Sequence, residues 1–185
     1  MCELKKEDVM RRIMLVDDEI NVLHSLERAI GRSEMQENVR VEGYVDTALA
    51  LQRAAEVPFD AVVSDYRMPS MSGVEFLRSY RQIQPDTVRI ILSASTEFDT
   101  LLGAINQAEV FRFMAKPWVD EAVREVLLQA FALRDKLRED LRLFNELRQH
   151  LGELTPQECE ARRLEELEPG ITRVNWGTDG SVLLD

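Results

Sequence analysis

The chain has 185 residues, of which 45% are hydrophobic and 31% are charged. This balance is typical of a folded domain with an appendage and excludes a disordered or fibrous chain. The formal net charge of −11 argues against a surface that neutralises nucleic-acid phosphates, so nucleic-acid binding is not expected. Two distant cysteines give neither a disulfide framework nor a metal site. The charged N-terminus and the lack of a long apolar run predict a cytoplasmic protein without membrane contact.

From Arg12 onward, short apolar runs alternate with helical patterns, which is typical of a parallel sheet with helices on both faces. The predicted strands cover residues 13–16, 39–44, 59–64, 88–92 and 111–114, and the predicted helices between them cover 20–30, 47–56, 74–83 and 98–108. We therefore predict an α/β fold with a doubly wound, five-stranded parallel sheet. Residues 1–10 form an N-terminal extension, and residues 11–130 form the domain.

A long helical pattern begins near Asp120 and contains no Pro or Gly before Gly152. Roughly 30 residues at 1.5 Å each would span about 45 Å, so residues 131–152 should extend beyond the domain. Apolar residues recur in this region at spacings of mostly three and four: Leu133, Leu137, Leu141, Phe144, Leu147, Leu151 and Leu154. This spacing fits a coiled-coil seam between two copies and a helix hairpin within one chain equally well.

Residues 153–185 form a separate C-terminal segment. Thr155 and Pro156 are typical of a new helix start, and this helix is expected to end near Glu168. Residues 171–176 and 181–184, separated by a glycine-containing turn, predict a small β-hairpin.

Polar side chains follow four of the predicted strands. Asp17 and Asp18 follow the first strand, Asp65 the third, Ser93 the fourth and Lys116 the fifth. Ligands of open parallel sheets bind at the carboxyl ends of the strands, so these groups should converge. Clustered carboxylates favour a divalent cation, and Mg²⁺ suits them because it prefers oxygen ligands. A carboxylate in such a site can attack phosphorus, and a lysine and a hydroxyl can stabilise the transferred group.

Each of these residues also has an ordinary structural explanation. An Asp pair after a strand can cap a helix, a serine is common in loops, and a lysine before proline is usually a solvated surface residue. Their joint placement at strand ends is what predicts a site.

Three segments then match a known family. Residues 15–19 (LVDDE), 64–69 (SDYRMP) and 113–118 (FMAKPW) resemble the signature segments of the response-regulator receiver family, with Ser93 at its Ser/Thr position. The resemblance covers about residues 10–130. It implies a flavodoxin-like (βα)5 fold.

The resemblance also implies roles for individual residues. Asp65 would be phosphorylated by a sensor histidine kinase, with Lys116 and Ser93 assisting at the phosphoryl group. Phe113 would be the switch aromatic that turns inward. Arg67 and Ser95 are placed to tune hydrolysis of the phosphoryl group. Mg²⁺ would be held by Asp17, Asp18, Asp65 and the backbone carbonyl of Arg67.

The sequence says less about the output of the switch, that is, the target or domain on which it acts. Residues 131–185 are too few for a cyclic-di-nucleotide enzyme and show no basic recognition helix. We predict a non-enzymatic switch that acts through an unknown protein target or a homodimer formed by the long helix. The alternatives are a DNA-binding transcriptional regulator and the receiver part of a cyclic-di-nucleotide enzyme whose output domain lies outside this sequence. A haloacid-dehalogenase-type phosphatase is disfavoured because it needs a second Asp where this chain has Arg67.

Overall fold

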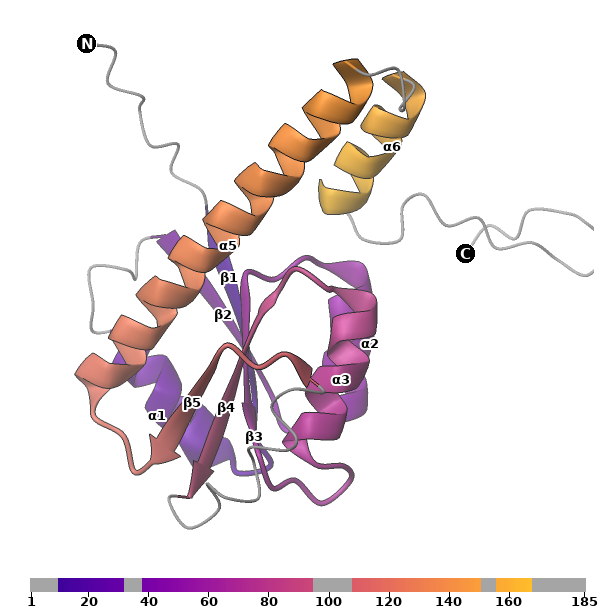
Figure 1. Cartoon of the computed structure of the whole chain (residues 1–185). Coiled ribbons are helices and arrows are strands. Elements are labelled where there is room, and N and C mark those ends of the chain that lie inside the picture. The colour runs from indigo at the N-terminus through magenta and orange to yellow at the C-terminus, as the bar shows by residue number, and fades with distance from the viewer. Residues whose placement is uncertain (1–9, 32–37, 95–107, 151–155, 168–185) are drawn as a thin grey trace, which may run out of the picture.

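The computed structural model describes residues 10–31, 38–94, 108–150 and 156–167. Its strands are β1 (Arg11–Val16), β2 (Val39–Tyr44), β3 (Ala61–Asp65), β4 (Val88–Ala94) and β5 (Arg112–Lys116), and its helices are α1 (Ile20–Gly31), α2 (Thr47–Glu56), α3 (Gly73–Ile83), α5 (Asp120–His150) and α6 (Pro156–Leu167). These elements confirm the predicted α/β fold (Figure 1). The predicted helix 98–108, apart from its last residue, and the predicted terminal hairpin lie outside the described residues.

All five strands pair in parallel in the order β2-β1-β3-β4-β5. This is the doubly wound, flavodoxin-like order that was predicted. The chain runs outward from β1 to β2 and then returns to β3 on the other side of β1. The order therefore reverses between β1 and β3, which pair with Val16 beside Ser64. The carboxyl ends of these two strands open a crevice at that point.

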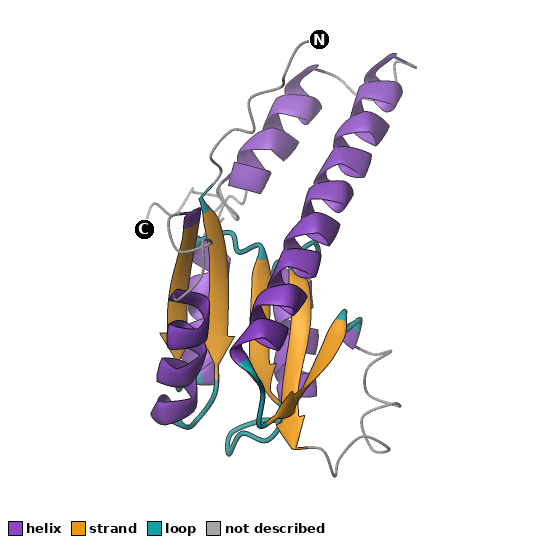
Figure 2. Cartoon of the chain, turned by 90° about the vertical axis from the view of Figure 1, so that its left-hand side faces the viewer, coloured by secondary structure: helices purple, strands orange, loops and turns teal. Residues whose placement is uncertain are grey.

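Helices cover both faces of the sheet, and the strand residues alternate between two cores. Ile13 and Leu15 pack in a core with α1 and α5, whereas Met14 and Val16 pack in a second core with α2 and α3. Figures 1 and 2 show these helices on opposite sides of the sheet. Burial on both faces explains why β1 and β3 are continuous apolar runs instead of alternating polar and apolar ones.

Polar side chains fix the starts of two helices. The Asp46 carboxylate accepts hydrogen bonds from the backbone N–H groups of Ala48 and Leu49, as a helix cap does. Ser72 and Glu75 form a reciprocal capping box at the start of α3. The second cap leaves only seven residues, 66–72, between the end of β3 and the start of α3, so it limits the loop that follows Asp65.

Helix α5 has 31 residues and would span about 46 Å. Val123, Leu127 and Phe131 pack it onto the sheet, and its outer half continues past the sheet beside α6 (Figure 2). Arg162 of α6 donates a hydrogen bond of 3.0 Å to Asn145 of α5. The predicted long helix and the helix after it are thus confirmed, and the two form a hairpin within the chain. None of the described helices is both long and apolar enough to cross a bilayer.

A buried carboxylate joins three elements at the amino end of the sheet. The Asp60 carboxylate accepts a hydrogen bond from the Arg12 backbone N–H at 2.9 Å. It also pairs with Arg11 at 3.5 Å and with Arg138 of α5 at 3.2 Å. Arg11 reaches the exposed Asp135 of α5 at 2.6 Å. This network fixes α5 to the sheet at the level where the helix leaves the domain.

Asp60→Ala should lower the free energy of unfolding by about 2–3 kcal/mol, because it leaves the Arg12 N–H without its acceptor and two guanidiniums without their shared carboxylate. Asp135→Ala is the matched control. It removes an exposed partner of the same Arg11 and should cost less than about 1 kcal/mol. Urea unfolding followed by circular dichroism measures both values. Equal costs for the two variants would contradict the role given to Asp60.

Candidate functional site

Lys116 lies between two buried carboxylates at the carboxyl end of the sheet. Its Nζ is 2.7 Å from Oδ2 of Asp17 and also forms an ion pair with Oδ1 of Asp65. The side chains of Asp17 and Asp65 are only 1% and 9% exposed. The three residues come from the ends of β1, β3 and β5, so a single ammonium group links strands that are not all neighbours. Two carboxylates share one cation, and the cluster has a net negative charge when all three groups are ionised.

Burial and hydrogen bonding act in opposite directions on the pKa values of this cluster. Burial raises the pKa of Asp17 by more than the hydrogen bonds from Lys116 and the Glu19 N–H lower it. For Lys116, burial lowers the pKa, but the hydrogen bonds to Asp17 and Asp65 together raise it above its usual value. Lys116 therefore stays protonated at neutral pH. The charged form of Asp17, in contrast, is disfavoured by the fold.

The backbone after β3 orients Asp65. Its Oδ2 accepts a hydrogen bond of 2.7 Å from the Arg67 N–H, and the Tyr66 N–H donates to the Leu92 carbonyl at 2.8 Å. Gly73 closes this loop by donating its N–H to the Tyr66 carbonyl at 2.8 Å. These bonds limit the positions that the Asp65 carboxylate can take.

Gly73 is a site residue that the sequence analysis did not identify. A Cβ atom at this position would lie 2.0 Å from the backbone oxygen of Asp65. No side chain fits there, because the contact is with backbone and not with the end of a flexible side chain. The sequence feature that could have identified it is a glycine at the first position of the helix that follows the Asp65 loop.

The structure brings most of the predicted site residues to one place. A hollow of about 270 Å³ is lined by Asp18, Glu19, Asp65, Arg67, Ser93, Ala94 and Lys116. The buried Asp17 touches this set through Lys116. Ser93 is almost fully buried, and its hydroxyl makes a long hydrogen bond of 3.3 Å to the Ala94 carbonyl.

Besides Asp17, two predicted residues do not line this hollow as the structure describes it. Phe113 is half-buried and packs against the second core, on the side of α2 and α3. Ser95 lies outside the described residues. The interior packing of Phe113 suits both a plain core residue and an aromatic side chain that changes position.

The oxygen donors at this end of the sheet fit Mg²⁺. No group of three His, Cys, Asp or Glu side chains stands at metal-ligand positions in the part of the chain that the structure describes. The two oxygens of Asp17 are already used, one by the Glu19 N–H and one by Lys116. Asp18, Asp65 and Arg67 nevertheless line one hollow. Mg²⁺ usually binds only one or two carboxylates and keeps several waters, so these oxygen donors fit it.

The doubly wound fold and the Asp–Asp–Lys cluster at its switch point define a receiver domain. The chain belongs to the response-regulator receiver family, because the family model for the response regulator receiver domain matches residues 13–128. The resemblance found in the sequence is thereby confirmed.

Individual relatives agree with this assignment. The chain is 30% identical to the hydrogenase transcriptional regulatory protein HoxA of Cupriavidus necator over 123 residues, which are 66% of this chain and 24% of that protein. Among solved structures, an adenylate cyclase from Rhodopirellula baltica has 27% identity and a TM-score of 0.66, covering 74% of this chain and 98% of that chain. The signal receiver domain of an HD domain-containing protein from Pseudomonas fluorescens Pf-5 has 29% identity and a TM-score of 0.64, covering 70% and 93%. The chain thus spans about a quarter of HoxA, and the likeness concerns the receiver.

Gly73→Ala should displace the Asp65 loop, because the added methyl group meets backbone that cannot move aside. We expect a loss of about 1–3 kcal/mol in the free energy of unfolding, as for other overpacked sites. Gly31→Ala is the matched control, since a Cβ there meets nothing within 4 Å. It should change the stability by less than about 1 kcal/mol. Thermal and urea unfolding of both variants test this. If Gly73→Ala left the free energy of unfolding unchanged, the close approach of Gly73 to the Asp65 backbone oxygen would be disproved.

Asp17→Asn should stabilise the protein at neutral pH in buffer containing EDTA. The raised pKa of Asp17 means that its protonated form is favoured in the fold. The stability that protonation provides is present below the usual pKa of 3.8 and is lost as the pH rises through the folded pKa. Asparagine does not ionise, so the gain over the wild type should be largest near pH 7 and vanish towards pH 3.8. Urea unfolding across this range measures it, and a loss of stability at pH 7 would contradict it.

Proposed function

We propose that Asp65 accepts a phosphoryl group from a sensor histidine kinase and that this modification switches the protein between two interaction states. The observation that carries the proposal is the pairing of Asp65 and Asp17 with Lys116 inside a hollow that also contains Asp18 and Ser93. Receiver domains are phospho-accepting switches and typically not enzymes, and the site proposed here likewise accepts one group per chain. The same proposal places the protein in the cytoplasm.

In the proposed transfer, a carboxylate oxygen of Asp65 attacks the phosphorus of a phosphohistidine. The new O–P bond forms as the N–P bond breaks, and the bonding electrons return to the imidazole nitrogen. The hydrogen bond from the Arg67 N–H holds the carboxylate while this occurs. Lys116, already in contact with Asp65, can follow the charge to a phosphoryl oxygen, and the Ser93 hydroxyl can donate a hydrogen bond to another.

The same site would bind Mg²⁺ during transfer. Asp18, Asp65 and the backbone carbonyl of Arg67 would hold the ion, and Asp17 would contribute its charge through its pairing with Lys116. When bound, the ion supplies positive charge that offsets the carboxylates and the phosphoryl oxygens. Lys116 alone leaves the cluster with an excess of negative charge, which is why a second cation suits it.

The switch is proposed to pass from the hollow to the face of β5. Lys116 and Phe113 lie on the same strand, three residues apart. A shift of Ser93 toward the phosphoryl group would let Phe113 turn inward from its half-buried position and so favour one of two states of this face. Arg67, which lines the hollow, is placed to affect hydrolysis of the phosphoryl group.

The output is proposed to be a protein–protein contact made through α5 and α6. The similarity to HoxA raises a DNA-binding regulator as a second candidate, and the similarity to receivers of cyclase and HD-domain proteins raises a nucleotide-enzyme output. All three comparisons concern the receiver, however, and none reaches an output domain within this chain. The net charge of −11 continues to disfavour DNA binding by this chain.

Incubation with acetyl phosphate and Mg²⁺ should label the wild type with at most one phosphoryl group per chain, and Asp65→Asn should abolish the labelling. Phosphate-affinity electrophoresis and intact mass spectrometry measure the product. Lys116→Met should reduce it, because the cation that follows the phosphoryl charge is gone. Removal of Mg²⁺ with EDTA should lower the wild-type labelling to that of Asp65→Asn.

Asp60→Asn is the control, because Asp60 is a buried carboxylate at the opposite end of the sheet. It should keep its label. Labelling that persists in Asp65→Asn, or continuous turnover of a phosphomonoester, would overturn the proposal.

A further inference from the structure

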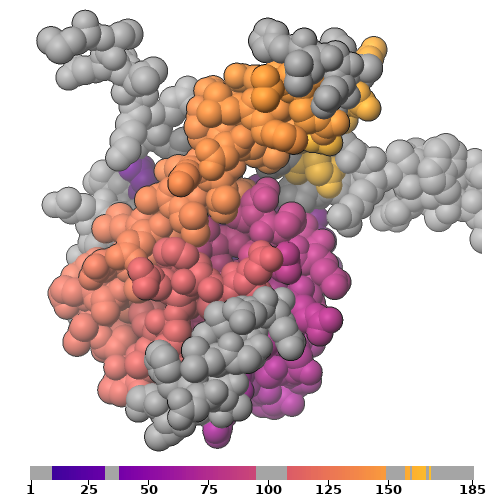
Figure 3. Space-filling model, in the orientation of Figure 1, coloured from indigo at the N-terminus to yellow at the C-terminus, as the bar shows by residue number. Residues whose placement is uncertain are grey.

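Helix α5 presents an apolar stripe on the part that extends beyond the receiver. Leu137, Phe144 and Leu147 are 41%, 54% and 56% exposed, although each is a large apolar side chain. Together with Asp140 they are separated by three, four and three residues along the chain, as the core positions of a coiled coil are. We call Leu137, Asp140, Phe144 and Leu147 the α5 stripe. Figure 3 shows that the outer half of α5 projects from the body of the domain.

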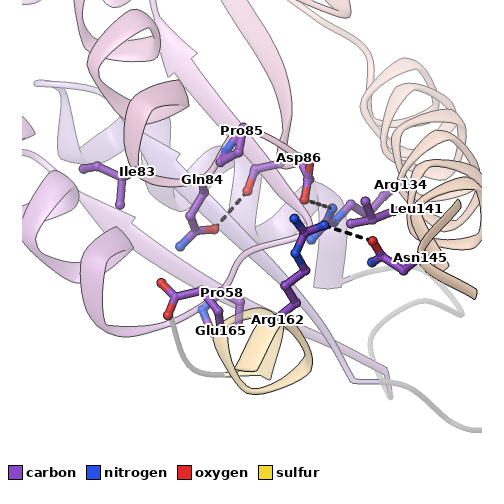
Figure 4. Close-up of a pocket in the computed structure, with 11 residues that line it drawn as sticks. Pro58, Ile83, Gln84, Pro85, Asp86, Arg134, Leu141, Asn145, Arg162 and Glu165 are labelled. Atoms are coloured by element: carbon purple, nitrogen blue, oxygen red, sulfur yellow. Dashed lines mark hydrogen bonds and ion pairs between the residues drawn. The ribbon is translucent and has the colours of Figure 1, made fainter. Parts of the chain in front are cut away.

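Helix α6 packs on a different face of α5. Its Arg162 bonds to Asn145, and a hollow of about 240 Å³ beneath it is lined by Leu141 of α5 and by Arg162 and Glu165 of α6. Figure 4 shows Leu141, Asn145 and Arg162 turned toward one another. On a helix of 3.6 residues per turn, the α5 stripe is centred roughly 90° away from Leu141 and Asn145. Hairpin packing therefore does not account for the stripe.

We propose that the α5 stripe binds the same stripe of a second copy of this chain, in an antiparallel arrangement. In a parallel pair with matched registers, Asp140 would face its own counterpart, and two carboxylates in an apolar seam repel each other. In an antiparallel pair centred level with Arg142, Leu137 lies opposite the partner's Leu147, and Asp140 lies opposite the partner's Phe144. The arrangement obeys two-fold symmetry, as closed homodimers do.

Charge complementarity supports the antiparallel orientation. The Arg148 guanidinium lies 5.8 Å from the centre of the Phe144 ring of the same helix. It therefore sits at the level of the layer that receives the partner's Asp140. Each Asp140 would meet a cation on the other copy, and because of the two-fold symmetry the dimer contains two such contacts. In a parallel pair, Arg148 is two turns away from Asp140 and cannot serve this purpose.

The size of the seam sets the strength of the dimer. Stable interfaces bury about 800 Å² on each partner, and three half-exposed side chains supply only part of that area. The dimer is therefore weak and reversible, and it forms as the protein concentration rises. It needs no phosphoryl group, so its success or failure is separate from that of the proposed phosphorylation.

Sedimentation equilibrium of the full, unphosphorylated chain tests the contact. The wild type should show a concentration-dependent monomer–dimer equilibrium, and the double variant Leu137→Glu, Leu147→Glu should weaken dimerisation at least about tenfold, since it introduces four charges into the seam. Leu128→Glu is the matched control, because Leu128 is 55% exposed on another face of α5. Circular dichroism checks that all variants keep their helix content. The proposal would be overturned if the wild type stayed monomeric at every concentration, or if Leu128→Glu dimerised as weakly as the double variant.

The orientation is tested with cysteines in a background that carries Cys2→Ser and Cys159→Ser. A mixture of the Leu137→Cys chain and the Leu147→Cys chain should form a mixed disulfide on mild oxidation, whereas Leu137→Cys alone should not link to itself. Asp140→Asn should weaken the dimer, because the contact with the partner's Arg148 is lost. Self-linking of Leu137→Cys, or a tighter dimer in Asp140→Asn, would show a parallel pair instead. Asp65→Asn should dimerise like the wild type even though it accepts no phosphoryl group.

Discussion

The contact of Lys116 with Asp17 and Asp65 is the interaction on which the carboxyl end of this domain depends. Two carboxylates that are nearly excluded from water require a cation, because an unpaired buried charge costs several kcal/mol. Lys116 provides that cation from β5, across the intervening strand β4. The contact stabilises the site but does not neutralise it. The remaining negative charge makes the hollow suited to a second cation, and the long lysine side chain could follow the charge of the phosphoryl group proposed for Asp65.

The two ends of the sheet use buried carboxylates in different ways. At the amino end, Asp60 is held by the guanidinium groups of Arg11 and Arg138 and by a backbone N–H. Arginine has a planar group with a fixed set of donors, which suits a permanent link between β1, the residue that precedes β3, and α5. At the carboxyl end, the partner is the flexible ammonium of Lys116. One end therefore keeps α5 in place while the other end can rearrange its contacts.

Much of the fold and the site could be predicted from the sequence, because both depend on local patterns. Continuous apolar runs locate the buried strands, and strand ends bring Asp65, Ser93 and Lys116 to one edge of the sheet. The distribution of charge among these residues was beyond sequence reasoning, which grouped three carboxylates around a metal. In the structure Lys116 donates a hydrogen bond to Oδ2 of Asp17, so the carboxylates are not equivalent. The need for glycine at Gly73 was also missed, since it arises from a backbone approach that only three-dimensional packing reveals.

The leucine pattern of α5 shows why the hairpin and the seam were equally good explanations from sequence. The two explanations use different residues of the same helix. Leu141 lines the hollow under α6, whereas Leu137, Phe144 and Leu147 remain exposed. Because α5 begins four residues after Lys116 and is fixed again at Arg138, its outer half has a defined direction relative to the hollow that contains Asp65. A helix held in this way can present one face to its own chain and leave another face open for a second chain.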